Sequence, residues 1–228
     1  MRAIAEPVLV LFDVDGTLVD SQASILGAMA SAFGEAGLPV PPRPAVLSVV
    51  GLSLDLGMAR LAPDADAATL ERLVAGYKRA FQADRAARGA AAAPFYPGAR
   101  AVLDALAAMP HVLLGVATGK SRRGLEALIA AHRLDRHFVT RQTADDHPSK
   151  PHPSMVLTAM AETGIDPART VLVGDTSYDM DMAAAAGVTG IGVAWGYHPP
   201  AALTRAHRVI DRCADLLPAL EELWRDAT

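Results

Sequence analysis

The chain contains short apolar runs that alternate with longer helix-like segments, and this alternation most constrains its fold. The first run, Val8 to Phe12, is continuous, apolar and partly β-branched, as in a strand that is buried on both faces of a sheet. Similar runs follow at 112–116, 138–139, 171–173 and 191–194. Segments of helical character lie between them, at 98–109, 121–132, 152–163 and 179–186. Alternating buried strands and helices predict an α/β fold with a doubly wound parallel sheet.

Residues 18–93 interrupt this alternation. They contain no convincing buried strand, but they include helix-like stretches at 21–37 and 66–92, with a cluster of prolines between them. We therefore predict a small all-helical cap domain at 18–93, inserted after the first strand. Residues 1–17 and 94–228 would then form the α/β core domain.

Composition excludes several classes of protein. A chain of 228 residues can bury roughly 70% of its surface, which supports a substantial core. The net charge of −4, with no dense basic block, argues against a nucleic-acid partner. The single cysteine, Cys213, rules out an internal disulfide, and we expect it to be a small buried residue. No run is apolar enough for a membrane helix, so we expect no membrane partner and a cytoplasmic location.

Two carboxylates follow the first apolar run, at Asp13 and Asp15. Ligands of open parallel sheets bind beyond the carboxyl ends of the strands. Two carboxylates at such a position can bind one cation, or can divide the roles of nucleophile and acid/base. The alternative is the Asp-Gly turn of a hairpin, which the helical character after Thr17 disfavours.

The second strong run ends in Thr118 and Gly119, just before a helix. The free N–H groups of a helix N-terminus can bind a phosphate there, although a simple N-cap would use the same residues. The segment also imitates a Walker A loop. That motif has four residues between its glycines, whereas only three separate Gly115 from Gly119, so a nucleotide-binding loop is disfavoured.

Three more charged residues stand in comparable places. Lys150 precedes a predicted helix, where it could offset a phosphate charge, hold a carboxylate, or simply be an exposed lysine. Asp175 follows the run at 171–173 and would reach the same pocket. Asp179 lies one helical turn later and by itself is only a favourable first-turn residue.

The order of these motifs resembles the haloacid dehalogenase-like superfamily over nearly the whole chain. The motifs are Asp-x-Asp-Gly-Thr, a strand ending in Thr, Lys-Pro, and Gly-Asp-x-x-x-Asp. The predicted cap resembles that of the phosphoglycolate phosphatase-like branch. This resemblance implies a Rossmann-like core and a phosphohydrolase.

The resemblance also implies a role for each charged residue. Asp13 would be the nucleophile and a metal ligand, and Asp15 the general acid/base, meeting the metal through its backbone carbonyl. Lys150 would stabilise charge. Asp175 would be a further metal ligand, with Asp179 supporting the metal shell. An oxygen-only site of this kind suits Mg²⁺.

Binding of the phosphate and of the rest of the substrate is also implied. Thr118 and the Gly119 amide would bind the phosphate. Gly119 stands where relatives often have Asn or Ser, so only its backbone contact is expected. The loop at Gly51 would reach the active site from the cap. Arg60 and Lys78, together with Arg79, are cap cations that could bind a substrate carboxylate, or could belong to an exposed helix face.

These implications lead to one expected function and two alternatives. We expect a Mg²⁺-dependent phosphatase that hydrolyses a small, phosphoglycolate-like phosphate monoester through an aspartyl-phosphate. One alternative is a phosphomutase of the β-phosphoglucomutase type, and the other is a non-catalytic phosphate-binding regulatory module. Dehalogenation is disfavoured because Asp15 is present. A small phosphorylated metabolite is the expected partner, and the chain would be a monomer or homodimer.

Overall fold

The structure is a computed structural model that describes residues 6–226 and contains one six-stranded sheet. The strands have the order β3-β2-β1-β4-β5-β6, and every neighbouring pair is parallel. They are β1 (Val8–Phe12), β2 (Val112–Thr118), β3 (Thr140–Thr143), β4 (Thr170–Gly174), β5 (Thr189–Val193) and β6 (Arg208–Ile210).

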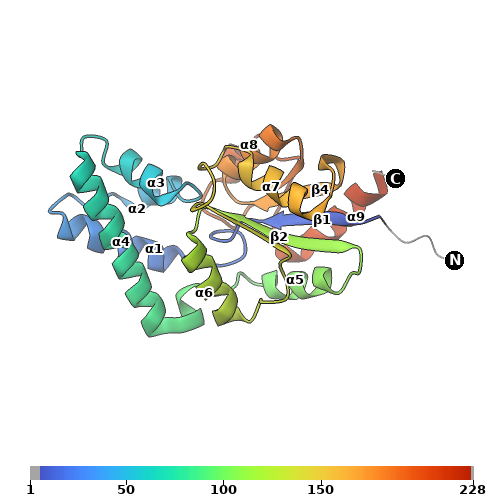
Figure 1. Cartoon of the computed structure of the whole chain (residues 1–228), viewed down its shortest axis with the longest axis horizontal. Coiled ribbons are helices and arrows are strands. Elements are labelled where there is room, and N and C mark those ends of the chain that lie inside the picture. The colour runs from blue at the N-terminus through green and yellow to red at the C-terminus, as the bar shows by residue number, and fades with distance from the viewer. Residues whose placement is uncertain (1–5, 227–228) are drawn as a thin grey trace.

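Helices cover both faces of this sheet (Figure 1). On one face lie α5 (Ala99–Ala107), α6 (Arg122–His132) and α9 (Leu216–Asp226), and on the other α7 (Ser154–Thr163) and α8 (Ser177–Ala186). Successive side chains of β1 divide between the two cores: Val10 and Phe12 pack in one, Leu9 and Leu11 in the other. This is the alternation of a strand buried on both sides, and it confirms the predicted doubly wound α/β fold.

The prediction of a strand at 138–139 is wrong. Phe138 packs into the apolar core, but Val139 is 59% exposed, and the third strand begins at Thr140. The residues of β3 are polar, and two of the buried ones, Thr140 and Gln142, both donate hydrogen bonds to Glu162 of α7. A pattern of apolar residues does not reveal a strand that is buried in this way. The edge strand β6 and the helix α9 are also absent from the sequence prediction.

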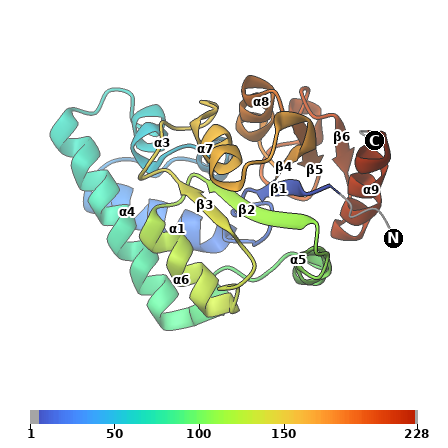
Figure 2. The ribbon, with the colours of Figure 1, turned by 45° about the vertical axis from the view of Figure 1, so that its right-hand side comes forward.

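Of the helices that lie between β1 and β2 in the chain, four gather beside the carboxyl ends of the strands (Figures 1 and 2). They are α1 (Gln22–Glu35), α2 (Arg43–Ser48), α3 (Leu54–Leu61) and α4 (Ala67–Arg88), the last followed by a 3-10 turn, η1 (Gly89–Ala92). We call α1–α4, with the loops between them, the helical insertion.

The helical insertion has an apolar cluster of its own, separate from the two cores of the sheet. Its buried members are Ile25, Met29, Ala32, Phe33, Val46, Met58 and Leu73. Leu18, Val19 and Ala93 pack instead with one core of the sheet. The domain boundaries at 18 and 93 stay a prediction.

Candidate active site

Three neighbouring strands bring the motif residues together. Asp13 follows β1, Thr118 ends β2 and Asp175 follows β4. Because β1 lies between β2 and β4, with Phe12 opposite both Val116 and Val173, these three residues meet at one edge of the sheet. This is where open α/β sheets bind ligands.

Lys150 connects two buried carboxylates at this edge. Its ammonium donates to Asp13 Oδ1 at 2.7 Å and to Asp179 Oδ1 at 2.6 Å, and all three side chains are buried. The exposed proline-loop lysine that the sequence allowed is therefore excluded. A buried ammonium is stable only with such partners.

The other two acidic residues are fixed by their neighbours. Asp175 accepts hydrogen bonds from the Thr17 hydroxyl at 2.9 Å and from the backbone N–H of Tyr197 at 2.8 Å. Asp179 Oδ2 accepts from the backbone N–H and the hydroxyl of Thr176, which caps α8. Asp179 is thus both a capping residue and a member of the buried cluster.

Glycines make room for the acidic cluster. A Cβ at Gly16 would lie 2.2 Å from Asp175 Oδ2, and one at Gly196 would lie 2.1 Å from the Asp175 Cβ. A Cβ at Gly174 would lie 2.4 Å from the Asp179 Cβ. The backbone therefore approaches these carboxylates more closely than any larger residue allows.

Burial shifts the pKa values in this cluster. Burial raises the pKa of Asp13 to about 7, although the Lys150 charge opposes this rise. Burial also raises the pKa of Asp175 well above its usual range, and the nearby charges of Asp13 and Asp179 raise it further. Burial lowers the pKa of Lys150, but Asp13 and Asp179 more than offset this, so it is raised overall and the ammonium stays charged.

The cluster fits a hard divalent cation. One oxygen each of Asp13, Asp175 and Asp179 lie within 4.8 Å of one another, and all three residues are buried. Three carboxylates share one ammonium, so in their charged forms they would carry two unbalanced negative charges. A divalent cation would balance them and would favour the charged carboxylates. The side chain of Asp15 is not in this cluster.

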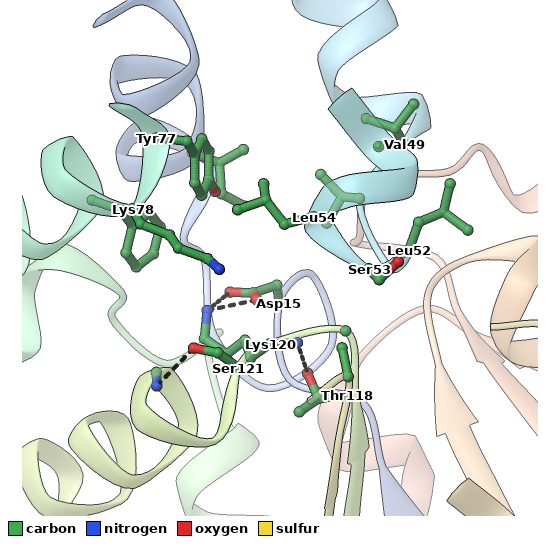
Figure 3. Close-up of a pocket in the computed structure, with 18 of the residues that line it drawn as sticks. Asp15, Val49, Leu52, Ser53, Leu54, Tyr77, Lys78, Thr118, Lys120 and Ser121 are labelled. Atoms are coloured by element: carbon green, nitrogen blue, oxygen red, sulfur yellow. Dashed lines mark hydrogen bonds and ion pairs between the residues drawn. The ribbon is translucent and has the colours of Figure 1, made fainter. Parts of the chain in front are cut away.

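Asp15 instead pairs with a lysine whose role the sequence analysis did not identify. The Lys120 ammonium donates to both carboxylate oxygens of Asp15, at 2.7 and 2.6 Å (Figure 3). The Ser21 hydroxyl also donates to Asp15. The Lys120 ammonium lies 5.1 Å from the centre of the Phe81 ring, so the helical insertion reaches this pair. Only three of the 21 basic residues are lysines, and this scarcity is the one signal in the sequence that points to Lys120.

The phosphate-binding candidates lie under the helical insertion. Thr118 is buried, and its hydroxyl accepts from the backbone N–H of Lys120. A Cβ at Gly119 would lie 2.7 Å from the carbonyl oxygens of both Gly51 and Leu52. The loop at Gly51 thus reaches this edge of the sheet, and an Asn or Ser at 119 would collide with it.

A cavity of about 180 Å³ opens between the helical insertion and the sheet. Polar residues line the part nearest the sheet: Asp13, Asp15, Thr118, Gly119, Lys120 and Ser121. Apolar residues of the helical insertion line the opposite part, among them Val49, Val50, Leu52, Leu54, Tyr77 and Phe81. Lys78 extends from α4 into this space (Figure 3). The other two cap cations lie elsewhere, because Arg60 bonds to Tyr178 and Arg79 to Glu35.

Comparisons with known proteins agree with this arrangement. The family model described as haloacid dehalogenase-like hydrolase matches residues 10–193. The chain is 36% identical over 227 residues to a probable phosphatase, IndB, of Dickeya dadantii, covering 95% of each protein. It is 30% identical over 220 residues to a phosphoglycolate phosphatase of Pasteurella multocida, covering 93% of this chain and 98% of that protein.

The fold is also similar to that of solved structures. The crystal structure of a hydrolase from Pseudomonas syringae matches with a TM-score of 0.82 and 26% identity, covering 94% of this chain and 98% of that one. In the part of the chain that the structure describes, no helix has the length and apolar character needed to cross a membrane.

The family model and the two similar proteins show that the chain is an enzyme of the haloacid dehalogenase-like hydrolase family, as the order of its motifs predicts.

Proposed function

We propose that this enzyme is a Mg²⁺-dependent phosphatase that hydrolyses a small organic phosphate monoester through an aspartyl-phosphate. The observation that carries the proposal is that the two carboxylate oxygens of Asp13 have different surroundings. Lys150 holds Oδ1, whereas Oδ2 has no partner within residues 6–226 and belongs to a residue that lines the cavity. Asp13 therefore has one oxygen fixed and one available as a nucleophile.

The first step transfers the phosphoryl group to Asp13. Oδ2 attacks the phosphorus, the ester P–O bond breaks, and Asp15 gives its proton to the departing alkoxide. Thr118 and the Gly119 amide bind the phosphoryl oxygens, while Lys150 offsets the charge on Asp13. The alcohol leaves with the proton.

The second step releases phosphate. Asp15, now a carboxylate, takes a proton from a water that attacks the phosphorus, and the bond between Asp13 and phosphorus breaks. Inorganic phosphate and free Asp13 are the products. Asp13, Asp175 and Asp179 would hold Mg²⁺, which reduces the repulsion between the anionic nucleophile and the anionic phosphate when bound. The contribution of the Asp15 backbone carbonyl stays a prediction.

A screen for phosphate release tests this proposal. The purified enzyme with Mg²⁺ should release phosphate from members of a panel of phosphorylated metabolites, and a chelator should abolish the activity until Mg²⁺ is restored. A second assay, for isomerisation of sugar phosphates with a bisphosphate primer, tests the phosphomutase alternative. No release from any member of the panel would refute the proposed function.

The variant Asp13→Asn tests the nucleophile. It keeps the size of the side chain and removes the attacking charge, so we expect kcat to fall by a factor on the order of 10³ or more. Arg79→Met is a matched control, because Arg79 lies outside the cavity lining and pairs with Glu35 on the surface. Unchanged turnover in Asp13→Asn would contradict the assignment.

A further inference from the structure

The cavity has cationic residues that the proposed mechanism does not use. Lys78 and Arg85 on α4 and Arg123 on α6 line it. Within residues 6–226, the side chains of these three residues have no ion-pair or hydrogen-bond partner. These are long, flexible side chains that can converge on one group.

Their sequence neighbours behave differently. Arg79 follows Lys78 and pairs with Glu35 at 2.7 Å, and Arg122 precedes Arg123 and pairs with Asp146 at 2.6 Å. Both neighbours lie outside the cavity lining. In each pair of adjacent cations, the residue with a protein partner lies outside the cavity lining. The residue without a partner lines the cavity.

The position of Arg123 is unfavourable for its own helix. It lies in the first turn of α6, which has no acidic residue, and a cation there opposes the helix dipole. Arg122 is offset by Asp146, but Arg123 has no such compensation. Arg123 thus lines the cavity at a small cost to its helix, which is a common property of residues with a functional role.

Two carboxylates also line the cavity outside the catalytic cluster. Asp145 accepts from the backbone N–H of Arg122 at 2.8 Å, and Asp55 lies in the first turn of α3. Both positions are favourable for an anion at a helix N-terminus. They therefore have local roles and do not account for the unpartnered cations.

An aromatic surface lies among these cations. Tyr77 and Phe81 stack with their ring centres 5.7 Å apart, and both line the cavity. Phe81 follows Lys78 by three residues and precedes Arg85 by four. These three side chains therefore share one face of α4. Phe81 also contacts the Lys120 ammonium, which places the aromatic pair next to Asp15.

We propose that the substrate is an organic phosphate with a second anionic group, bound by Lys78, Arg85 and Arg123, and with an apolar body between this group and the phosphate. The apolar body would lie against Tyr77, Phe81 and Leu54. This inference rests on the proposed function, and it describes a larger and more apolar alcohol than glycolate. A carboxylate or a second phosphate would satisfy the same cations.

Three phosphate esters test the proposed second anionic group and apolar body of the substrate. 4-Carboxyphenyl phosphate has the apolar body and the second anion, 4-carbamoylphenyl phosphate replaces that anion with a neutral group of similar shape, and phosphoglycolate has the anion without the apolar body. We expect kcat/KM to be highest for the carboxyl compound, exceeding the carbamoyl compound roughly tenfold, mainly through a lower KM.

Variants then connect this preference to the three cations. Lys78→Met, Arg85→Met and Arg123→Met should each reduce the ratio of kcat/KM for the carboxyl over the carbamoyl compound roughly fivefold. The adjacent controls, Arg79→Met and Arg122→Met, should leave it unchanged. The ratio is measured within one variant, so a small loss of folded protein does not alter it.

The outcomes separate this inference from the proposed function. Release of phosphate without a preference for the carboxyl compound, or an equal loss of preference in the control variants, would overturn the inference and leave the phosphatase intact. A lower KM for phosphoglycolate than for both aryl phosphates would overturn the apolar body. The absence of phosphate release from every compound would overturn the proposed function, and the inference with it.

Discussion

The Asp15 carboxylate accepts two hydrogen bonds from Lys120 and one from Ser21, so its orientation is strongly restricted. A general acid must have its proton within reach of the leaving group. Lys120 does not need to contact the substrate to affect turnover, because it fixes the group that does. We therefore regard Lys120 as a positioning residue.

The variant Lys120→Met should lower kcat about tenfold on an alkyl phosphate, whose leaving group needs a proton. It should have a much smaller effect on 4-nitrophenyl phosphate, whose leaving group is a stable anion. Lys120→Arg should restore much of the loss. An equal loss on both substrates would show that Lys120 acts on binding or folding and not through Asp15.

A substitution of the single residue Gly196 tests the proposed Mg²⁺ site. Gly196→Ala would place a Cβ 2.1 Å from the Asp175 Cβ, which must displace the carboxylate or the loop because packed atoms cannot overlap. We expect the Mg²⁺ concentration for half-maximal activity to rise roughly tenfold. Gly27→Ala is the control, since a Cβ there meets nothing within 4 Å. Equal Mg²⁺ requirements in both variants would contradict the placement of Asp175 at the metal.

At the scale of single elements, α8 connects stability to the site. The Thr176 hydroxyl accepts from the backbone N–H of Asp179, and the Asp179 carboxylate accepts from the backbone N–H of Thr176, which is a capping box. The same Asp179 side chain accepts from Lys150. The N-terminus of α8 thus holds one carboxylate of the buried cluster in place.

The variant Thr176→Ala should destabilise the protein by about 1 kcal/mol, which corresponds to about 2–4 °C in Tm for a chain of this size. Thr176→Ser keeps the hydroxyl and should retain most of the stability. Thermal unfolding followed by circular dichroism measures both. A similar loss in the two variants would mean that the methyl group, and not the cap, supplies the stability.

At the scale of the whole molecule, two contacts join the helical insertion to the core beside the site. The carbonyls of Gly51 and Leu52 lie against Gly119, and the backbone N–H of Ser53 donates to the Ser149 hydroxyl at 2.8 Å. The absence of a side chain at 119 permits this close approach. The distance between the two halves of the cavity therefore depends on that glycine.

Gly119→Ala should push the loop at Gly51 away from the sheet and lower kcat/KM about tenfold, because catalysis is sensitive to small displacements. The Tm should change little, since the apolar clusters on either side are not touched. Gly34→Ala is the control, because a Cβ there meets nothing within 4 Å. Unchanged kinetics in Gly119→Ala would show that the loop can move without cost.

Local patterns in the sequence are sufficient to predict the fold class and the edge of the sheet at which the motif residues lie. Continuous apolar runs such as Val8 to Phe12 can be satisfied only by burial on both faces, and residues after such strands must lie at one edge of the sheet. Asp13, Thr118 and Asp175 were therefore predictable from local pattern. The polar strand β3 was not, because its burial depends on Glu162, 20 residues or more away in the chain.

Which charged residues pair with each other depends on tertiary contacts. Asp15 and Lys120 are 105 residues apart, and Lys150 and Asp13 are 137 apart, and no local pattern specifies such contacts. The structure also separated Lys78 from Arg79 and Arg123 from Arg122, which are equivalent in sequence but face different surroundings. The physical reason is that secondary structure follows from local periodicity, whereas ion pairing and cavity lining depend on how distant elements pack.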